Sequence, residues 1–328
     1  MKYFLIISIS LFAFFSCKKE AKQEPTPPPV TGEKITVHFQ LGGDITTSVG
    51  DLRVGGNSIA AKTAFDSTIY AVNIRTAAGA LFAQGLFDNP DSIRLDILKD
   101  SSYIVNVAAI KKGSSYGLWW QMVGGYKQYP FPIHRTLRNR MFYAAEEAAG
   151  SAEAMQPAFA DSMAYFSVIR DSLTMAVDVF PISEVNAYFG STNYTARDTN
   201  NTDINLVLRR LVFAIQYKVF NLRQGYLEAT YGGQMRPDTL KIKDSLPVAR
   251  VYSADLFRSK DSIPGSQLQV TLTWVKGDGS KEVLGTKPIR PKRNSLTAIS
   301  VYLDIKNVDG TIGVNLGDTT WTNVNINY

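Results

Sequence analysis

The sequence predicts a mainly β protein with two antiparallel β-sandwich domains and a two-helix insertion between them or at the end of the first. Three observations predict it: apolar residues alternate with polar ones in many short runs, short turns separate these runs, and one stretch follows a helical period instead. The chain has 328 residues, 45% hydrophobic and 20% charged, as in ordinary globular proteins. At about 150 residues per domain, this length predicts about two domains.

Residues 34–111 are predicted to form successive strands joined by short turns. Alternation with a period of two is typical of a half-buried strand, and the last run is apolar on both faces apart from Asn106, as in a central strand. Because no helical pattern separates these runs, they favour an antiparallel sandwich over a parallel sheet. The runs cover residues 35–41, 70–75, 81–87, 93–97 and 103–110.

Residues 135–180 change period. Apolar residues recur there every three or four positions, first from Leu137 to Ala148 and then from Phe159 to Val177, with Gly150 and Pro157 between the two sets. This spacing predicts two amphipathic helices whose Met and aromatic residues pack in the core.

Strands are predicted to resume after a polar stretch, which places a domain boundary near residue 203. The N-terminal sandwich then covers 34–203 and the C-terminal sandwich 204–328. Asp278-Gly279 within 276–280 predicts a hairpin turn. In the last run, Val324, Ile326 and Tyr328 alternate with asparagines, so this strand can either close its own sheet or add to a partner's sheet. The strand runs cover 211–219, 268–274, 296–305, 311–316 and 321–328.

The first seventeen residues have the pattern of an export signal. Lys2 precedes an apolar stretch of thirteen residues, Tyr3 to Phe15, which is too short to span a bilayer. The following Ser16-Cys17 resembles the lipobox of bacterial lipoproteins, in which the Cys is acylated, as by palmitate. Residues 18–33 are polar and Pro-rich and predict a tether. We therefore expect a body anchored to outer-membrane lipid through acylated Cys17, at the cell surface.

Composition narrows the possible chemistry. Cys17 is the only Cys, which excludes an intrachain disulfide and a multi-Cys zinc site. The net charge of +6 is mild for this length and no run of five Lys or Arg occurs, so no nucleic-acid partner is expected. His38 and His134 are the only histidines. We expect no metal and no cofactor.

Two local patterns are predicted to be turns rather than chemical sites. Gly113-Ser114-Ser115-Tyr116-Gly117 matches the spacing of a nucleophile elbow but lacks the helix and the later His and acid that this motif requires. Residues 198–203 carry four Asp and Asn side chains, yet they lack the Gly and Glu of a calcium loop, which favours Asx turns. The protein is therefore not expected to be an enzyme.

An aromatic cluster spans residues 119–134. Trp119, Trp120 and Tyr126 belong to it, and two interpretations remain open. Buried, the rings would plug the core beneath a long loop; exposed and coplanar, they would stack on sugar rings.

Asp is followed by Ser or Thr in ten of its twenty occurrences. These pairs resemble the sites of a general O-glycosylation system for exported bacterial proteins, and they are equally typical of Asx turns and helix caps. The candidate acceptors are Ser67, Ser92, Ser162, Ser172, Thr239, Ser245, Ser262 and Thr319.

Several short motifs resemble those of fimbrillin-like surface lipoproteins, the subunits and anchors of type V pili. They are Tyr70-Ala71-Val72-Asn73-Ile74, Gly85-Leu86-Phe87-Asp88, Ala187-Tyr188-Phe189-Gly190, Leu208 to Phe213, and Asp309 to Val314. The resemblance implies two transthyretin-like sandwiches and a non-enzymatic role in adhesion or fimbrial assembly. It also implies processing by an Arg-specific protease in shaft subunits, for which Arg53 is the candidate position.

The predicted function is that of a lipid-anchored structural or adhesive surface protein, a fimbrial-type subunit or anchor. Its partners would be other fimbrial subunits or host and surface glycans. The alternative is a surface glycan-binding lipoprotein of a carbohydrate uptake system, which exposed coplanar rings in the aromatic cluster would favour.

Overall fold

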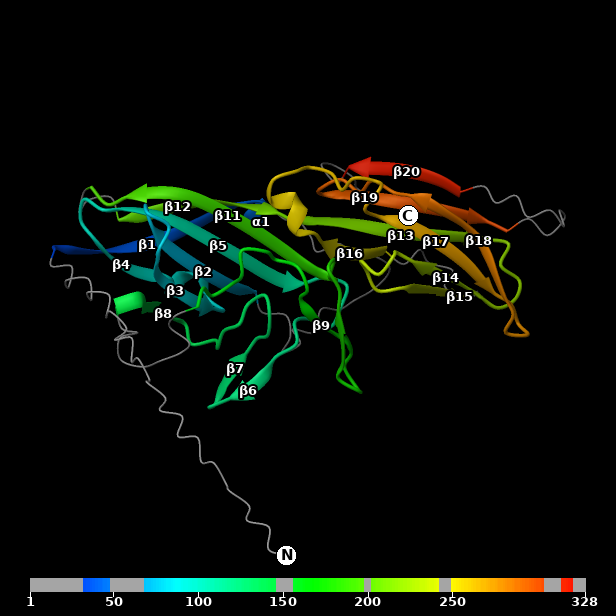
Figure 1. Ribbon diagram of the computed structural model, residues 1–328, viewed down its shortest axis with the longest axis horizontal. Helices are drawn as coiled ribbons and strands as arrows, with labels where there is room; N and C mark the ends of the chain where they lie inside the picture. The colour runs from blue at the N-terminus through cyan, green and yellow to red at the C-terminus, as the bar shows by residue number, and fades with distance from the viewer. Residues whose placement is uncertain are drawn as a thin grey trace, which may run out of the picture. The chain divides into compact units, whose positions relative to one another are not determined.

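The computed structural model describes residues 32–47, 68–145, 156–197, 202–241, 249–303 and 314–320, the last range and residues 46–47 by backbone alone. In these ranges the protein is mainly β, as predicted, and α1 (Asp44–Thr47) is the one α-helix (Figure 1). Two short 3-10 helices are η1 (Pro90–Ser92) and η3 (Asp255–Arg258). No helix in the described ranges is long and apolar enough to cross a membrane.

An eight-stranded sheet forms the first part of the body, in the order β4-β1-β12-β11-β5-β2-β3-β8. Neighbouring strands are antiparallel except β1 and β12, which run parallel. The strands are β1 (Lys34–Gly43), β2 (Ile69–Thr76), β3 (Leu81–Phe87), β4 (Arg94–Leu98), β5 (Ser102–Lys112), β8 (Arg140–Tyr143), β11 (Val185–Thr195) and β12 (Asp203–Arg210).

This sheet curls around its own core. The alternate apolar residues of β1, such as Val37, point into a buried cluster together with residues from every other strand of the sheet. The two edge strands also meet, because the backbone N–H of Asp96 in β4 donates to the hydroxyl of Tyr143 in β8 at 2.8 Å. A side chain thus covers a strand edge that would otherwise offer free N–H groups for pairing. The alternation seen in the sequence therefore predicted the inward face correctly.

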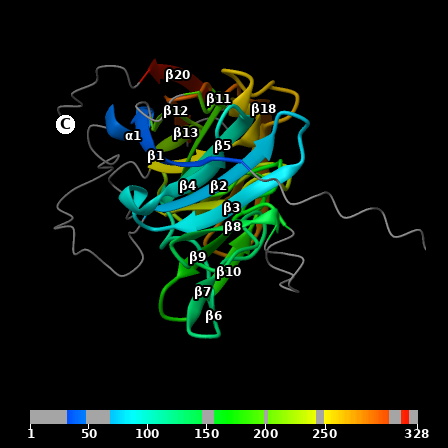
Figure 2. The same cartoon turned by 90° about the vertical axis from the view of Figure 1, so that its left-hand side faces the viewer.

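The central strand β5 is buried on both faces, as its sequence predicts. Val105 and Val107 belong to the core inside the curl, whereas Ala108 and Ile110 belong to a second core on the opposite face. Figure 2 shows β5, β2 and β3 side by side.

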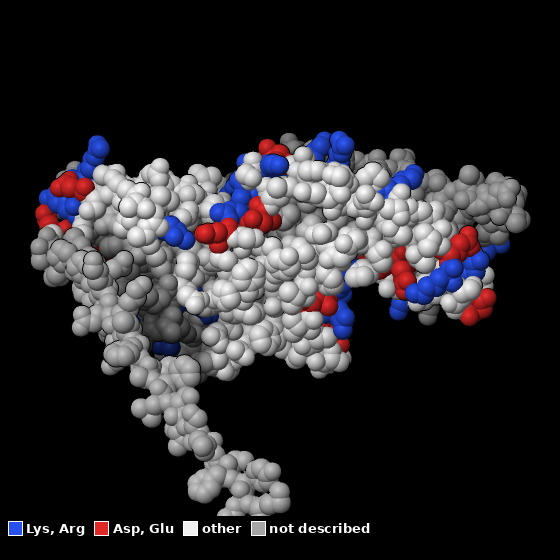
Figure 3. Space-filling model, in the orientation of Figure 1, with Lys and Arg blue, Asp and Glu red and all other residues white. Residues whose placement is uncertain are grey.

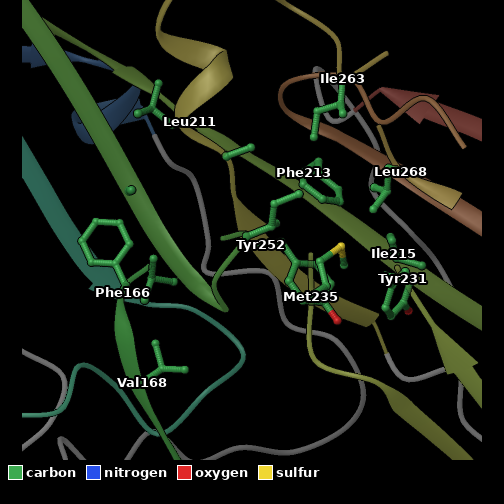
Figure 4. Packing of buried hydrophobic residues seen from close by; sticks show 14 of the residues in the cluster. Phe166, Val168, Leu211, Phe213, Ile215, Tyr231, Met235, Tyr252, Ile263 and Leu268 are labelled. Carbon is green, nitrogen blue, oxygen red and sulfur yellow. The ribbon is translucent and has the colours of Figure 1, made fainter. Parts of the chain in front are cut away.

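The second part of the body consists of two four-stranded sheets, ordered β16-β13-β19-β20 and β15-β14-β17-β18. Both contribute to one buried cluster, in which the rings of Phe213 and Tyr252 stack with centroids 5.6 Å apart (Figure 4). β13 and β19 are parallel, and the other pairs are antiparallel. The strands are β13 (Val212–Phe220), β14 (Tyr226–Thr230), β15 (Asp238–Lys241), β16 (Ala249–Ser253), β17 (Gln269–Val275), β18 (Lys281–Pro288), β19 (Ser295–Tyr302) and β20 (Val314–Thr320).

The two parts are joined by nearly continuous backbone. β12 ends at Arg210 and β13 begins at Val212, so the chain changes sheets at Leu211, whose N–H donates to the carbonyl of Ala187 at 2.8 Å. Contacts group Lys34–Tyr328 as one compact unit. A division at residue 203 into two domains therefore stays a prediction.

The two helices predicted for 135–180 are wrong. The described residues of this segment form β8, β9 (Ser167–Asp171), β10 (Ala176–Val179) and irregular backbone. Phe159, Met163 and Phe166 are buried as the pattern requires, but from an extended path. Tyr165 has φ 63° and Met175 φ 51°, which no α-helix accommodates. Apolar residues spaced by three or four indicate only that every third or fourth side chain is buried. An irregular loop that packs against a sheet can bury its side chains at the same spacing.

The hairpin turn predicted at 276–280 is confirmed. The N–H of Lys276 donates to the carbonyl of Ser280 at 2.9 Å, and Gly279 supplies the required positive φ of 84°.

Candidate functional site

The candidate site lies on the excursion, residues 113–184, which connects β5 to β11 and contributes the edge strand β8 to the eight-stranded sheet on the way. β5 and β11 pair along their whole length, with Lys112 opposite Val185 and Ser102 opposite Thr195. A hairpin of this kind closes with a loop of a few residues. The excursion is therefore not needed to connect the two strands, and its size requires another explanation.

One role of the excursion is to cover the outer face of the sheet. Phe159 and Phe166 join the core formed by that face and the second part of the body. Asn73, buried in β2, holds the excursion by its amide: Nδ2 donates to the carbonyl of Phe159 at 2.9 Å, and Oδ1 accepts from the N–H of Ala158 at 2.6 Å. Both polar atoms of a buried Asn are thereby satisfied.

The excursion also exposes apolar surface. Ten of the fourteen exposed large hydrophobic side chains in the described part of the chain belong to it. Concentrated exposure of this kind is typical of an interaction surface. The ten are Tyr116, Met122, Val123, Tyr126, Phe131, Tyr165, Leu173, Met175, Val177 and Val179.

Four of these side chains lie on the β9–β10 hairpin. Leu173 (94% exposed) and Met175 lie in its turn, and Val177 and Val179 continue the same period of two on the exposed face of β10. On the other face of β10, Asp178 forms ion pairs with Arg170 and Arg236 at 3.6 and 3.5 Å. In the described ranges β10 has β9 as its single strand partner, so its outer edge is open.

A second hairpin is formed by β6 (Gln121–Val123) and β7 (Tyr126–Gln128). Its turn is Gly124-Gly125, with φ of 57° and 83°, the left-handed conformation that such a turn requires. Met122, Val123 and Tyr126 are exposed around this turn. β6 and β7 lie close to β9 and β10 in Figure 2, and the backbone N–H of Trp119, which precedes β6, donates to the carbonyl of Ser167 in β9 at 2.8 Å.

The aromatic cluster is divided between core and surface. Trp120 packs against the core and is covered by Lys127, whose Nζ lies 4.7 Å from the ring centroid. Trp119 is half-buried and lines a cavity of about 360 Å³ together with His134 and Arg135. Tyr126 is exposed, with the Arg138 guanidinium 4.5 Å from its ring. No ring contact joins two of these three residues in the described chain, so they form no coplanar stacking platform.

A charged cluster connects the excursion to the second part of the body. The carboxylate of Glu184, which is buried, accepts from Arg236 Nε at 2.6 Å, from Arg250 Nη1 at 3.3 Å and from Ser114 Oγ at 2.8 Å. Arg250 also pairs with Asp238. The cluster borders a cavity of about 410 Å³. No sequence pattern predicted it, because its members are far apart in the chain and meet only when both sheets are in place.

Burial alters the protonation of the groups beside this cluster. Burial raises the pKa of Asp238, with Arg250 partly opposing the shift. By itself burial would lower the pKa of Arg250, but Asp238 and Glu184 raise it above its ordinary value. Burial also raises the pKa of Tyr217 and of Tyr231, whose hydroxyl donates to Asp238 at 2.6 Å. The tyrosines therefore remain neutral hydrogen-bond donors, and the cluster is suited to holding structure together.

The elbow-like motif forms a turn, as predicted. Ser115 is buried, and its hydroxyl donates to the carbonyl of Glu184 at 3.0 Å and accepts from the N–H of Gly117 at 3.2 Å. Both interactions fix the backbone after β5. His134 is exposed and its ring contacts Phe131 edge-on, with centroids 5.2 Å apart.

The Asp-Ser and Asp-Thr pairs differ in accessibility. Ser162, Ser172, Thr239 and Ser262 are exposed, and Ser92 is half-buried with its hydroxyl donating to Asn89 O at 2.6 Å. Thr319 is described by its backbone in β20 only. Cys17, Arg53, Ser67 and Ser245, as well as residues 198–201 and 321–328, lie outside the described residues. Within the described ranges no three His, Cys, Asp or Glu gather as metal ligands would.

The sequence matches no protein-family profile and no curated protein. Solved structures with a similar fold include a candidate cell adhesion protein from Bacteroides eggerthii (13% identity, 89% of this chain and 97% of that one, TM-score 0.41). A fimbrial assembly protein from Parabacteroides distasonis (10%, 87% and 99%, TM-score 0.37) and the fimbrial anchor protein Mfa2 from Porphyromonas gingivalis (10%, 88% and 97%, TM-score 0.37) are also similar. Fimbrial and adhesion proteins are thus among the structures this chain is similar to, in fold alone.

Proposed function

We propose that this protein is a lipid-anchored structural or adhesive protein of the cell surface, a subunit or anchor of fimbrial type, that binds other subunits through β10. The exposed apolar alternation on an open edge strand carries the proposal. An added strand satisfies the free backbone groups of such an edge, and alternate side chains supply specificity. Burying one such side chain contributes roughly 1.5–3 kcal/mol, so several together support a durable contact.

The N-terminal sequence supports the location. Cys17 ends the only long apolar run and is followed by the Pro-rich tether 18–33. Acyl chains on this Cys would hold the body at a membrane, at about 0.8 kcal/mol per buried methylene.

The test places charge on the exposed face of β10. A Val177→Lys, Val179→Lys double variant, expressed in the native host, should reach the outer membrane in normal amount but lose the crosslinked high-mass assemblies that contain it. Charged side chains block strand addition without disturbing the buried face. Val283→Lys on β18, also an exposed apolar position, is the matched control and should assemble normally. Normal assembly of the double variant would rule out β10 as the contact.

O-glycosylation of the exposed Asp-Ser and Asp-Thr pairs belongs to the same proposal. Native protein should have a mass above that of its polypeptide, with modified peptides containing Ser162, Ser172, Thr239 or Ser262. An unmodified mass would leave Asx turns as the explanation.

The glycan-binding alternative receives less support. Stacking on a sugar requires open ring faces, and Lys127 covers Trp120. Processing at Arg53 remains a prediction that N-terminal sequencing of surface-exposed protein would check.

A further inference from the structure

We propose that the tip of the β6–β7 hairpin docks onto an anionic lipid bilayer. Met122 is 58% exposed, and Val123 and Tyr126 are exposed beside it. All three flank the Gly124-Gly125 turn at the tip of the hairpin. In the described chain β6 and β7 form a sheet of two strands, with no third strand beside them. Transfer of aliphatic side chains from water into an apolar environment is favourable, and the interior of a bilayer is such an environment.

The charge around the hairpin matches an anionic surface. Residues 101–145 contain no Asp or Glu, and Figure 3 shows no acidic side chain around β6 and β7 on the face it draws. Lys127 lies on β7 itself, and Arg138 lies over Tyr126, next to the tip. Each Lys or Arg near an anionic bilayer favours binding by about fivefold.

The exposed aromatic ring beside the turn is also suited to a membrane interface. Tyr126 begins β7 and is exposed, whereas Trp119 is half-buried and Trp120 packs against the core. Trp and Tyr prefer the headgroup level, where the ring is apolar and its polar atom remains hydrated. The hairpin therefore presents apolar side chains at its tip, with Tyr126 and the cations Lys127 and Arg138 beside them, as a bilayer interface requires.

The neighbouring β9–β10 hairpin does not have this combination. Leu173 and Met175 are exposed at its tip, but the carboxylate of Asp171 lies there too, accepting from the N–H of Leu173 at 2.9 Å and from Thr174 Oγ1 at 2.8 Å. These hydrogen bonds lower the pKa of Asp171 and keep it ionised. An ionised carboxylate is repelled by an anionic bilayer. We therefore assign the β9–β10 hairpin to the proposed contact with other subunits and not to the bilayer.

The tether brings a bilayer within reach. Residues 18–33 separate Cys17 from β1, and at about 3.1 Å per residue such a tether extends about 50 Å. This part of the inference rests on the proposed lipid anchor at Cys17. The anchor raises the effective concentration of lipid at the hairpin. The docked state would therefore be populated even if the hairpin bound lipid weakly.

The experiment uses the full lipidated protein in vesicles of phosphatidylethanolamine and phosphatidylglycerol. Because Cys17 is blocked by acylation, a Met122→Cys variant offers one thiol for an environment-sensitive dye. The dye should shift to the blue and be quenched by a lipid-phase quencher. A Val283→Cys variant on β18 is the matched control and should report water.

Charge is tested in the same background. Replacing phosphatidylglycerol by phosphatidylcholine, or adding Arg138→Gln, should lower the ratio of inserted to free dye, about fivefold for the single substitution. Flotation with the vesicles reports the anchor, and the dye reports the hairpin. Protein that floats while its dye at position 122 stays in water overturns the docking alone; protein that does not float overturns the anchor as well. A dye in water combined with lost cellular assembly of a Met122→Asp variant would assign the tip to a protein partner instead.

Discussion

Glu184 is the residue on which the excursion and the second part of the body meet. Its carboxylate is buried between two arginines that follow it by 52 and 66 positions in the chain. A buried carboxylate of this kind is stable only while its partners neutralise it, and the arginines in turn depend on it. Asp44, which is more exposed, also joins distant parts of the chain: it accepts from the N–H of Arg210 and from Arg293 Nη1, both at 2.9 Å.

Glu184→Gln should destabilise the protein by about 3 kcal/mol, because it leaves Arg236 and Arg250 without their shared counter-charge. The measurement is the free energy of unfolding in urea. Glu282→Gln is the matched control: Glu282 pairs with Lys276 at 2.8 Å but is exposed, and such pairs are worth about 0–1 kcal/mol. Equal effects of the two substitutions would contradict the role given to Glu184.

The pKa of Asp238 makes stability depend on pH in a definite direction. Burial raises it above its usual value of 3.8, so the folded protein binds this proton more tightly than the unfolded chain does. The resulting stabilisation is complete below pH 3.8 and is lost as the pH rises through the folded pKa. The free energy of unfolding of the wild type, relative to Asp238→Asn, should therefore fall with rising pH above that value.

Asp278 provides the control of opposite sign. The Ser280 hydroxyl and N–H donate to it and lower its pKa. Stability relative to Asp278→Asn should therefore be lost as the pH falls. Parallel pH profiles for the two variants would contradict both assignments.

Among the secondary-structure elements, the two hairpins of the excursion differ from the large sheets in having only two strands each. Each is a two-stranded sheet with one exposed face, whereas β5 is buried on both faces. Two strands alone are marginally stable, so each hairpin depends on its attachment at the base. The apolar side chains that they expose are therefore retained at a cost in solubility, which is the expected signature of a contact surface.

The tight approach of β14 to the end of β17 depends on Gly225, which has φ +71°. A Cβ at this position would overlap the carbonyl oxygen of Val275. Gly225→Ala should lower the free energy of unfolding by more than the about 1 kcal/mol expected for the left-handed backbone alone. Gly279→Ala is the matched control. Gly279 has φ +84° but no atom lies within 4 Å of a Cβ added there, so this substitution measures the cost of the left-handed backbone alone. A smaller effect at Gly225 than at Gly279 would contradict the close approach.

At the scale of the whole molecule, the proposed lipid anchor at Cys17 can be tested by a single substitution. Cys17→Ser should remove the acyl anchor and release the protein from membranes or block its maturation. Fractionation of cells with detection of the protein in each fraction measures this. If the substituted protein partitions with the outer membrane at the wild-type level, the anchor is excluded.

The sequence by itself determined the mainly β class and the strand faces of the described sheets. Alternation at a period of two depends only on local geometry, so the inward residues of β1 and the double burial of β5 could be predicted. The turn at 276–280 followed from Asp278-Gly279 for the same reason. Positive φ is a local property of the residue, so turn chemistry can be recognised without the fold.

The tertiary structure alone decided the fate of the excursion and the position of the charged cluster. Leu173 and Val177 fit a helical stripe, yet in the structure Leu173 lies in an exposed hairpin turn and Val177 on the exposed face of β10, because a spacing of four fits a helix and a strand alike. The burial of Phe159 and Phe166 depends on the outer face of a sheet built from other parts of the chain. Glu184, Arg236 and Arg250 carry no shared pattern; they meet because Leu211 passes the chain from one sheet to the next. Contacts between residues so far apart in sequence are set by the packing of the sheets, which no local period encodes.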